Sequence, residues 1–260
     1  MRFLKGSARK HHRVKCMEYF VNMNGIDVRA YYSDETINEI FMPLLGRLSA
    51  MQKEKNRRIL VLLAAPPGAG KSTLASFLQK LSEENDKLTD IQAIGMDGFH
   101  RRQEYLTSHK TVRDGHEVRM VDIKGAPITF DLDLFIERIK RVLNEKKVSW
   151  PSYDRHLHNP VDDAILVEKD IVLLEGNYLL LDEDGWRELK KMADYSIFLS
   201  ADEDMLRDRL IDRKIKSGNS RDIAEKFVDY SDMANVRLCL NKSSKADLML
   251  AFDKTGIRKA

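Results

Sequence analysis

The sequence predicts an α/β protein with three layers, in which a mostly parallel sheet carries helices on both faces. Short apolar runs at 91–96, 171–176 and 195–200, and another that begins at Leu60, are typical of strands buried on both sides. Segments with apolar residues at helical spacing separate these runs. Because strands and helices alternate from 59 to 252, helical connections between parallel strands are expected.

The stretch 60–77, LVLLAAPPGAGKSTLASF, organises the rest of the chain. An apolar run leads into a Gly/Pro-rich turn, which an amphipathic helical segment follows. The N–H groups of such a turn and of the helix N-terminus form an anion site, where the lysine reaches phosphates and the serine hydroxyl holds Mg²⁺. This order indicates a P-loop NTPase fold that binds ATP and Mg²⁺. The expected nucleotide-binding residues are Pro67, Gly68, Ala69, Gly70, Lys71, Ser72 and Thr73.

One position departs from the motif G-x-x-x-x-G-K-[ST]. Ala65 stands where the first glycine is expected, and glycine tolerates backbone angles that alanine resists. The alternative is an ordinary strand–turn–helix with an incidental lysine. The order of strand, turn, Lys-Ser-Thr and helix argues against that alternative.

Length and composition limit the classes of protein. The chain has 260 residues, which suits one large α/β domain with an appendage at roughly 100–200 residues per domain. A hydrophobic content of 43% is typical of a globular protein. A net charge of only +3 does not indicate a nucleic-acid binder. No apolar run reaches the roughly 18 residues of a membrane helix, so no membrane partner is expected. Cys16 and Cys239 form no CxxC pair, and a cytoplasmic location is expected. Whether the chain forms a homo-oligomer stays open.

We expect an N-terminal part over 1–56 and a nucleotide-binding domain over 57–260. The N-terminal part begins with a basic tail, which we interpret as a solvated start. Apolar residues alternate around Asn24-Gly25, which predicts a β-hairpin over 17–32. Ser33 then precedes a helical pattern, inside which Pro43 could cause a bend.

Two carboxylates stand at the ends of predicted strands. Asp97 follows the strand at 91–96, and Glu175 lies at the end of the strand at 171–176. The carboxyl ends of the strands of an open α/β sheet face the crevice where ligands bind. Glu175 has the position of the acid that acts at Mg²⁺ in P-loop enzymes.

The remaining segments divide into loops and helices. We interpret 101–119 and 148–160 as polar loops beside the site. His156 and His158 could suggest a metal, but too few ligands accompany them. Asp131 is expected to cap a helix. Helices are predicted over 184–192, 202–216 and 221–238, and a last strand over 248–252. Arg209 and Arg213 share a helix face.

A P-loop followed by a strand that ends in Asp97-Gly98-Phe99-His100 resembles a family of small-molecule kinases. This is the uridine kinase, type I pantothenate kinase and phosphoribulokinase group, and the likeness is to its nucleoside/nucleotide kinase-like or fructokinase-like branch. Stretches at 124–131, 151–165 and 171–186 resemble the same branch. Residues 209–218 resemble its lid, R-L-x-x-R-x-x-x-x-G, around 207–220. Ser231-Asp232-Met233-Ala234-Asn235 resembles its N-D-x-P-N, with Ser and Ala replacing Asn and Pro. The resemblance covers about 58–252.

The resemblance implies ATP-dependent phosphoryl transfer to a hydroxyl of a small molecule. It implies that Asp97 is the base, that Lys71 and Ser72 bind phosphate and Mg²⁺, and that Glu175 acts at the metal. It also implies that Arg209 and Arg213 come from a closing lid. The catalytic residues would thus be Asp97, Lys71, Arg209 and Arg213, and the metal would be held by Ser72 and Glu175. The residues expected to bind the acceptor are His100, Tyr153, Asp154 and Arg155.

The acceptor and the general class of function leave alternatives. The cationic loops favour a sugar, a sugar acid or a phosphorylated metabolite over a plain nucleoside, and pantothenate-like acids stay possible. A nucleotide-driven switch that binds a protein or nucleic acid is the alternative function. A guanine-nucleotide switch would carry N-K-x-D, and Ser244 occupies the Asp position after Asn241-Lys242. A regulatory protein without turnover is disfavoured by the retained Lys71 and Asp97.

Overall fold

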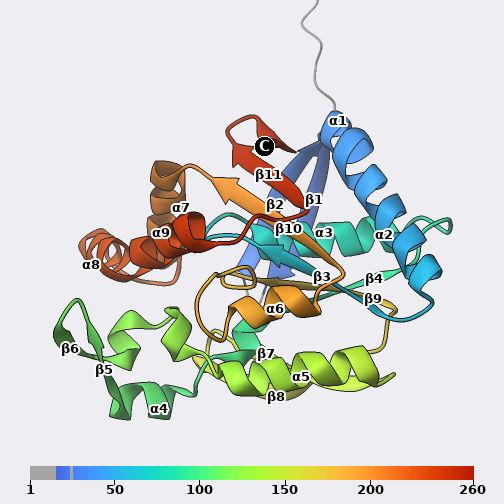
Figure 1. Ribbon diagram of the computed structural model, residues 1–260. Helices are drawn as coiled ribbons and strands as arrows, with labels where there is room; N and C mark the ends of the chain where they lie inside the picture. The colour runs from blue at the N-terminus through green and yellow to red at the C-terminus, as the bar shows by residue number, and fades with distance from the viewer. Residues whose placement is uncertain (1–15, 24–25) are drawn as a thin grey trace, which may run out of the picture.

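The computed structural model describes residues 16–23 and 26–260. Its centre is a six-stranded sheet in the order β12-β11-β10-β3-β9-β4 (Figure 1). Its first five strands along the chain run parallel, and β12 pairs antiparallel with β11 at one edge. The strands are β3 (Ile59–Ala64), β4 (Ile91–Gly95), β9 (Ile171–Gly176), β10 (Tyr195–Ala201), β11 (Leu248–Asp253) and β12 (Gly256–Lys259). The predicted, mostly parallel sheet is therefore confirmed, with an antiparallel edge strand that was not predicted.

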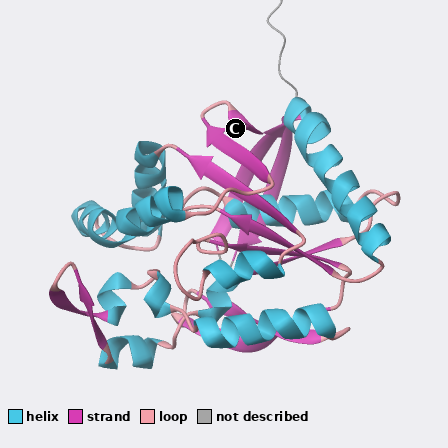
Figure 2. Cartoon of the chain, viewed as in Figure 1, coloured by secondary structure: helices cyan, strands magenta, loops and turns pink. Residues whose placement is uncertain are grey.

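Helices cover both faces of this sheet, and each face has its own hydrophobic core (Figures 1 and 2). Val61 and Leu63 of β3 belong to the first core, whereas Leu60 and Leu62 belong to the second, because successive side chains of a strand point to opposite faces. The main helices are α2 (Met42–Lys55), α3 (Lys71–Glu83), α5 (Leu132–Asn144), α6 (Arg187–Met192), α7 (Glu203–Lys216), α8 (Arg221–Phe227) and α9 (Met233–Lys242). The first core contains residues of α2, α3 and α7, and the second contains residues of α5 and α6. The predicted three layers are confirmed.

The N-terminal hairpin packs on the helix that follows the P-loop. Strands β1 (Cys16–Met23) and β2 (Ile26–Ser33) pair antiparallel as predicted, while Asn24-Gly25 and the basic tail over 1–15 lie outside the described residues. The ring of Tyr32 stacks on Phe77 of α3 at 4.2 Å between centroids, and the Tyr19 hydroxyl lies 2.7 Å from Ser76 Oγ. The hairpin is therefore part of the first core.

The predicted helix after Ser33 is present and contains a π-turn. Ser33 Oγ accepts a hydrogen bond from the Thr36 amide at 3.0 Å and so caps α1 (Asp34–Thr36). The π-helix η1 (Ile37–Phe41) then leads directly into α2. Pro43 is the second residue of α2 and follows η1 directly, so its missing N–H falls where the regular α-helical hydrogen bonding is already interrupted. The irregularity therefore precedes the proline as a π-turn.

The prediction of a loop over 101–119 is wrong. This segment forms α4 (Gln103–Ser108) and a hairpin of β5 (Lys110–Arg113) and β6 (His116–Arg119). Asp114 and Gly115 both have positive φ, at 52° and 78°, as a tight hairpin turn requires. The Asp-Gly pair was the available signal, but the strands are four residues each and mostly exposed, so no buried face marked them.

The prediction of a loop over 148–160 is also wrong. Strands β7 (Val148–Asp154) and β8 (Asn159–Val167) form an antiparallel hairpin. Pro151 suggested a break in the strand, but the register shifts between Trp150 and Ser152, and a proline fits such an irregularity. Buried Val148, Trp150 and Val167 anchor the hairpin in the second core.

The predicted helix over 221–238 is divided in three. Between α8 and α9 lies the π-helix η5 (Val228–Asp232), whose last two residues are buried. Short 3₁₀ turns, η2 (Met96–Phe99), η3 (Met120–Ile123) and η4 (Pro127–Thr129), complete the described elements. Within the described ranges, no helix has both the length and the apolar character needed to cross a bilayer.

Candidate active site

The P-loop is the turn that connects β3 to α3. At two of its positions the backbone has a conformation that only glycine adopts easily. Gly68 and Gly70 have φ of 84° and 91°, in the left-handed region. Gly70 also precedes the first residue of α3, so Lys71 and Ser72 begin the helix at its N-terminus. Ala65, at the position of the missing glycine, is buried and is not among the residues with positive φ. The departure from the motif is therefore compatible with the turn.

Ser72 faces the predicted metal-site carboxylate. Its Oγ donates a hydrogen bond to Glu175 Oε1 at 2.8 Å. Burial raises the pKa of Glu175, as does the charge of Asp97, against the opposing effects of Lys71 and the Ser72 hydrogen bond. A serine hydroxyl and one carboxylate suit Mg²⁺, which takes few protein ligands and keeps waters and substrate phosphates. Within residues 16–23 and 26–260, no three or more His, Cys, Asp or Glu side chains are grouped so that they could hold a metal ion. His156 and His158 therefore do not belong to such a group.

Asp97 lies in the turn η2 that follows β4. Burial acts to raise the pKa of this carboxyl, but the charges of His100, Lys71, Arg155 and Arg213 outweigh burial and the pKa is lowered. Asp97 therefore carries its negative charge at neutral pH. Its neighbour Glu175 is the carboxylate of the pair that holds a proton more readily.

The backbone around Asp97 is held by close packing. A Cβ atom added to Gly98 would overlap the carbonyl group of Pro151 in β7. The Trp150 indole donates a hydrogen bond from Nε1 to the Gly95 carbonyl at 2.9 Å. The ring of Phe99 packs on Trp150 at 4.8 Å between centroids. The β7–β8 hairpin thus fixes the turn that carries Asp97.

His100 and Tyr153 lie together beside this turn. The His100 ring contacts Phe130 and Tyr153, at 3.9 and 5.2 Å between centroids, and its Nδ1 lies 2.9 Å from the Asp97 carbonyl oxygen. Because a carbonyl only accepts, Nδ1 carries a proton and donates it to this oxygen. Burial lowers the pKa of His100, against the opposing charge of Asp97, and burial raises the pKa of Tyr153 to about 12.

Lys124 belongs to the same group and was not predicted. Its Nζ lies 5.2 Å from the Tyr153 ring centroid and donates to Gln103 Oε1 at 2.7 Å and to the His158 carbonyl at 2.9 Å. Burial lowers its pKa to about 8. The sequence placed Lys124 only in the stretch 124–131 that resembles the kinase branch, because its partners come from distant segments.

Asp154 and Arg155 differ in orientation. Asp154 Oδ1 accepts hydrogen bonds from the amides of His156 and Leu157, at 2.7 and 2.9 Å, so this oxygen shapes the hairpin turn. The charge of Arg155 acts on both Asp97 and Glu175. Arg155 Nε is buried and has no hydrogen-bond partner among the described residues. Arg155 is thus directed to the site, and a role for Asp154 in acceptor binding stays a prediction.

The two arginines of α7 reach different parts of the site. A Cβ atom at Gly70 of the P-loop would lie 3.6 Å from Arg209 Nη2, and the Arg209 guanidinium lies 4.9 Å from the Phe252 ring centroid. Arg213 is half-buried, which lowers its pKa, and its charge acts on Asp97. The α7 face therefore brings positive charge to the phosphate loop and to the predicted base.

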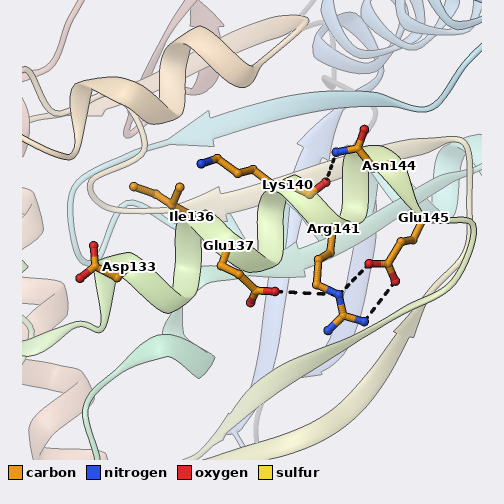
Figure 3. Close-up of a pocket in the computed structure, with 7 residues that line it drawn as sticks. All are labelled: Asp133, Ile136, Glu137, Lys140, Arg141, Asn144 and Glu145. Carbon is orange, nitrogen blue, oxygen red and sulfur yellow. Dashed lines mark hydrogen bonds and ion pairs between the residues drawn. The ribbon is translucent and has the colours of Figure 1, made fainter.

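Two hollows of the surface lie apart from the P-loop. One, of about 440 Å³, follows α5 and is bordered by Asp133, Ile136, Glu137, Lys140, Arg141, Asn144 and Glu145 (Figure 3). In its wall Arg141 pairs with Glu145 at 2.8 Å and with Glu137 at 4.0 Å. The other, of about 520 Å³, adjoins Gly98–His100 and the β7–β8 hairpin, and Arg102 pairs with Asp162 at 2.5 Å in its wall. Neither contains Lys71, Ser72 or Asp97.

Comparison with known proteins identifies the family. The sequence profile of the "Phosphoribulokinase / Uridine kinase family" matches residues 60–251. The chain belongs to this family. The kinase is 41% identical to YggC of Escherichia coli (strain K12) over 241 residues, which cover 92% of this chain and 98% of YggC. It is 32% identical to a uridine kinase of Halalkalibacterium halodurans, over 65% of this chain and 70% of that protein.

Solved structures agree with this assignment. A protein to which the name fructose transport system kinase has been given, from Silicibacter sp. TM1040, superposes with a TM-score of 0.68 at 31% identity, covering 79% of this chain and 98% of its own. YFH7 from Saccharomyces cerevisiae, at 18% identity and a TM-score of 0.66 over 81% and 98% of the two chains, shares the fold. The protein is an ATP-dependent small-molecule kinase, as the resemblance implied. The alternative of a switch is therefore disfavoured.

Proposed function

We propose that this kinase transfers the γ-phosphoryl group of Mg·ATP to a hydroxyl group of a small, hydroxyl-rich metabolite. The observation that carries the proposal is Asp97, a carboxylate with a lowered pKa on a tightly packed turn, within electrostatic reach of Lys71 and Arg213. The uridine kinase relative and the neighbour named for fructose transport support an acceptor with sugar hydroxyls. Sugars, sugar acids, pantothenate-like acids and nucleosides are the candidate acceptors.

In this mechanism the protein mainly positions groups and supplies positive charge. The P-loop amides and Lys71 bind the β- and γ-phosphates, and Arg209 and Arg213 stabilise the negative charge of the transferring group. Ser72 and Glu175 would hold Mg²⁺, which would supply further positive charge for phosphoryl transfer, and Glu175 orients the Ser72 hydroxyl. The acceptor oxygen forms its bond to the γ-phosphorus while the bond to the leaving ADP oxygen breaks. Asp97 orients the acceptor hydroxyl and accepts its proton.

The nucleotide part of the proposal is tested by Lys71→Ala. Loss of the lysine should weaken Mg·ATP binding by at least roughly tenfold in titration calorimetry, because a charge-assisted contact to phosphate is removed. Lys140→Ala on the exposed face of α5 is the matched control and should bind normally. Unchanged affinity in Lys71→Ala would exclude this P-loop as the ATP site.

The chemical part is tested by Asp97→Asn, which keeps the shape and removes the base. An ADP-release assay over nucleosides, sugars, sugar acids and pantothenate first finds the acceptor. Turnover of Asp97→Asn should then fall by about 10²–10⁴-fold, with Mg·ATP affinity retained. Asp122→Asn is the matched control. The Asp122 carboxylate pairs with Arg119 at 2.7 Å and lies away from the site, so this variant should keep its turnover. Turnover near the wild-type value in Asp97→Asn would assign this residue a structural role.

A further inference from the structure

The first half of α7 packs directly on the phosphate loop. A Cβ atom added to Gly68 would lie 3.2 Å from Leu210 Cγ and 3.4 Å from the Leu206 carbonyl oxygen. Leu206 and Leu210 are fully buried in the first core, so this part of the helix is fixed. A Cβ atom at Gly70 would lie 3.6 Å from Arg209 Nη2. Arg209 therefore reaches the P-loop without any closing movement of its own helix turn.

An aromatic ring faces the Arg209 guanidinium. The guanidinium lies 4.9 Å from the ring centroid of Phe252, near the end of β11. Burial lowers the pKa of Arg209, which shows that its charge is partly removed from water. Arg207, two residues earlier on α7, pairs instead with the Asp229 carboxylate at 2.6 Å. Across residues 16–23 and 26–260, no carboxylate forms an ion pair with Arg209.

A ring and a carboxylate hold a guanidinium with different consequences. The face of an aromatic ring attracts the cation but leaves its charge and its N–H donors available to another partner. A carboxylate would occupy those donors, and it would repel a phosphate that arrives at the P-loop. The attraction between ring and cation is stronger where the cation is desolvated. Phe252 can therefore orient Arg209 without competing with phosphate for it.

The N-terminal segment supports the strand that carries this ring. Phe252 pairs with Ile257 in the β11–β12 hairpin. The Ile257 carbonyl accepts a hydrogen bond from Thr36 Oγ1 at 3.0 Å, and Thr36 Oγ1 accepts one from Ser33 Oγ at 2.9 Å. Thr36 is 8% exposed, so this bond is shielded from water. Both Phe252 and Thr36 lie outside the residues 60–251 that the family profile matches.

We propose that Phe252 is a positioning residue of the ATP site, which holds the Arg209 guanidinium at the phosphate loop. The inference rests on the proposed function, because it assigns Arg209 to the phosphates of ATP. Phe252 acts through the guanidinium and makes no contribution through the adenine base. The hydrogen bond from Thr36 to Ile257 supports the ring, so the N-terminal segment contributes to nucleotide binding.

The first experiment compares Phe252→Leu with Phe20→Leu. Both remove a ring that faces an arginine, because the Arg29 guanidinium lies 5.1 Å from the ring centroid of exposed Phe20 on β1. The probes are Mg·ATP and Mg·tripolyphosphate, which has no base, and titration calorimetry measures their affinity. Phe252→Leu should weaken both by about three- to thirtyfold, and Phe20→Leu should change neither by more than about twofold. Phe252→Tyr keeps an aromatic face and should bind both probes like the wild type.

The variant Arg209→Met completes a double-mutant cycle. Alone, it should weaken tripolyphosphate binding at least roughly tenfold, because a charge-assisted contact is lost. Phe252→Leu should then add less than about twofold, since the group through which the ring acts is gone. An equal penalty for Phe252→Leu with and without Arg209 would overturn the proposal. A loss confined to Mg·ATP would also overturn it, because the ring would then contact the base, and so would unchanged affinity for both probes.

The second experiment tests the support from the N-terminal segment. Thr36→Val keeps the shape and removes the hydroxyl that bonds Ile257, whereas Thr36→Ser keeps a hydroxyl. Thr36→Val should lower the melting temperature and weaken tripolyphosphate binding by roughly two- to fivefold, and Thr36→Ser should retain the affinity. With Arg209→Met, Thr36→Val should still lower the melting temperature but no longer weaken binding. A lower melting temperature with wild-type affinity in Thr36→Val would overturn the role of this segment.

Failure of the proposed function has a different signature. It would appear as unchanged Mg·ATP affinity in Lys71→Ala, whatever the result for Phe252. If Lys71→Ala weakens binding and Phe252→Leu does not, the P-loop remains the ATP site and only the positioning role of Phe252 is overturned. None of these binding measurements requires the acceptor.

Discussion

At the residue scale, the motif around Asp97 depends on the absence of a side chain at Gly98. The backbone of η2 lies against the Pro151 carbonyl, where a Cβ atom would overlap it. This contact involves two backbones, so no flexible side chain can move aside to relieve it. The glycine is therefore required by close packing, because its φ is not among the positive values.

Gly98→Ala should destabilise the protein by roughly 1–3 kcal/mol, or more if the turn moves, because the added methyl group overpacks a rigid contact. Urea unfolding measures the loss, and turnover should fall with it, since Asp97 is the preceding residue. Gly46→Ala in α2 is the matched control. Its Cβ would meet no atom within 4 Å, and alanine is the better helix former, so its stability should not fall. Similar unfolding curves for both variants would contradict the packing argument.

Individual site residues were predictable where a local pattern carried them. Lys71, Ser72 and Gly70 follow from the order of strand, turn and helix, which fixes their geometry within a few residues. Lys124 did not follow, because it depends on Gln103 and His158, which are distant in sequence. Asp154 shows the converse, since part of its carboxylate is used by its own turn.

At the scale of elements, one buried arginine joins three segments. Arg58, immediately before β3, donates to the carbonyl of Lys169 from Nε, to those of Val142 and Glu145 from Nη1 and to that of Lys146 from Nη2, at 2.5–2.8 Å. The guanidinium thereby satisfies carbonyls at the C-terminal end of α5, which have no partner within the helix. It also holds the segment that leads into β9.

Arg58→Lys should lower the free energy of unfolding by roughly 2–4 kcal/mol, because one ammonium cannot reach carbonyls that a planar guanidinium contacts along three directions. Chemical denaturation is the measurement. The neighbour Arg57, which is half-exposed and pairs with Asp194, provides Arg57→Lys as the control with a smaller effect. If both variants unfold at the same urea concentration, Arg58 contributes no more than a surface arginine.

Elements were predictable where burial gave them a period. Strands β3, β9 and β10 are mostly apolar and buried, and were recognised directly. The hairpins β5–β6 and β7–β8 were missed because the first is mostly exposed and the second contains Pro151. The π-turn η5 was missed because its residues continue a helical pattern, and only its hydrogen bonding, in which the Met233 amide donates to the Val228 carbonyl, reveals it.

At the scale of the whole molecule, residues 16–56 share a core with the P-loop domain. The side chains of Tyr32, Phe41 and Leu45 are buried in the same cluster as Phe77 of α3, the helix that begins with Lys71. The N-terminal part was predicted as a separate segment ahead of the nucleotide fold, and this boundary stays a prediction. Its packing indicates that the two parts fold together.

Deletion of residues 1–56 should leave the domain insoluble or unable to melt cooperatively. Each large apolar side chain that loses its burial removes about 1.5–3 kcal/mol. Several such losses exceed the roughly 5–15 kcal/mol that stabilises a typical domain. Soluble yield and a calorimetric melting curve test this expectation, with deletion of residues 1–15 as the control that retains both strands. A shortened 57–260 chain that melts cooperatively and binds Mg·ATP would show that the domain is independent.

The packing of Trp150 against the turn of Asp97 has an optical consequence. The chain contains two tryptophans, and both are buried. The Trp150 indole is hydrogen-bonded to the Gly95 carbonyl. The Trp186 ring contacts Phe130, whose ring also contacts His100. Any acceptor that shifts the Asp97 turn or the His100 ring changes the surroundings of an indole. The native fluorescence spectrum should therefore change as an acceptor fills the site, so that unlabelled protein could report acceptor occupancy in real time.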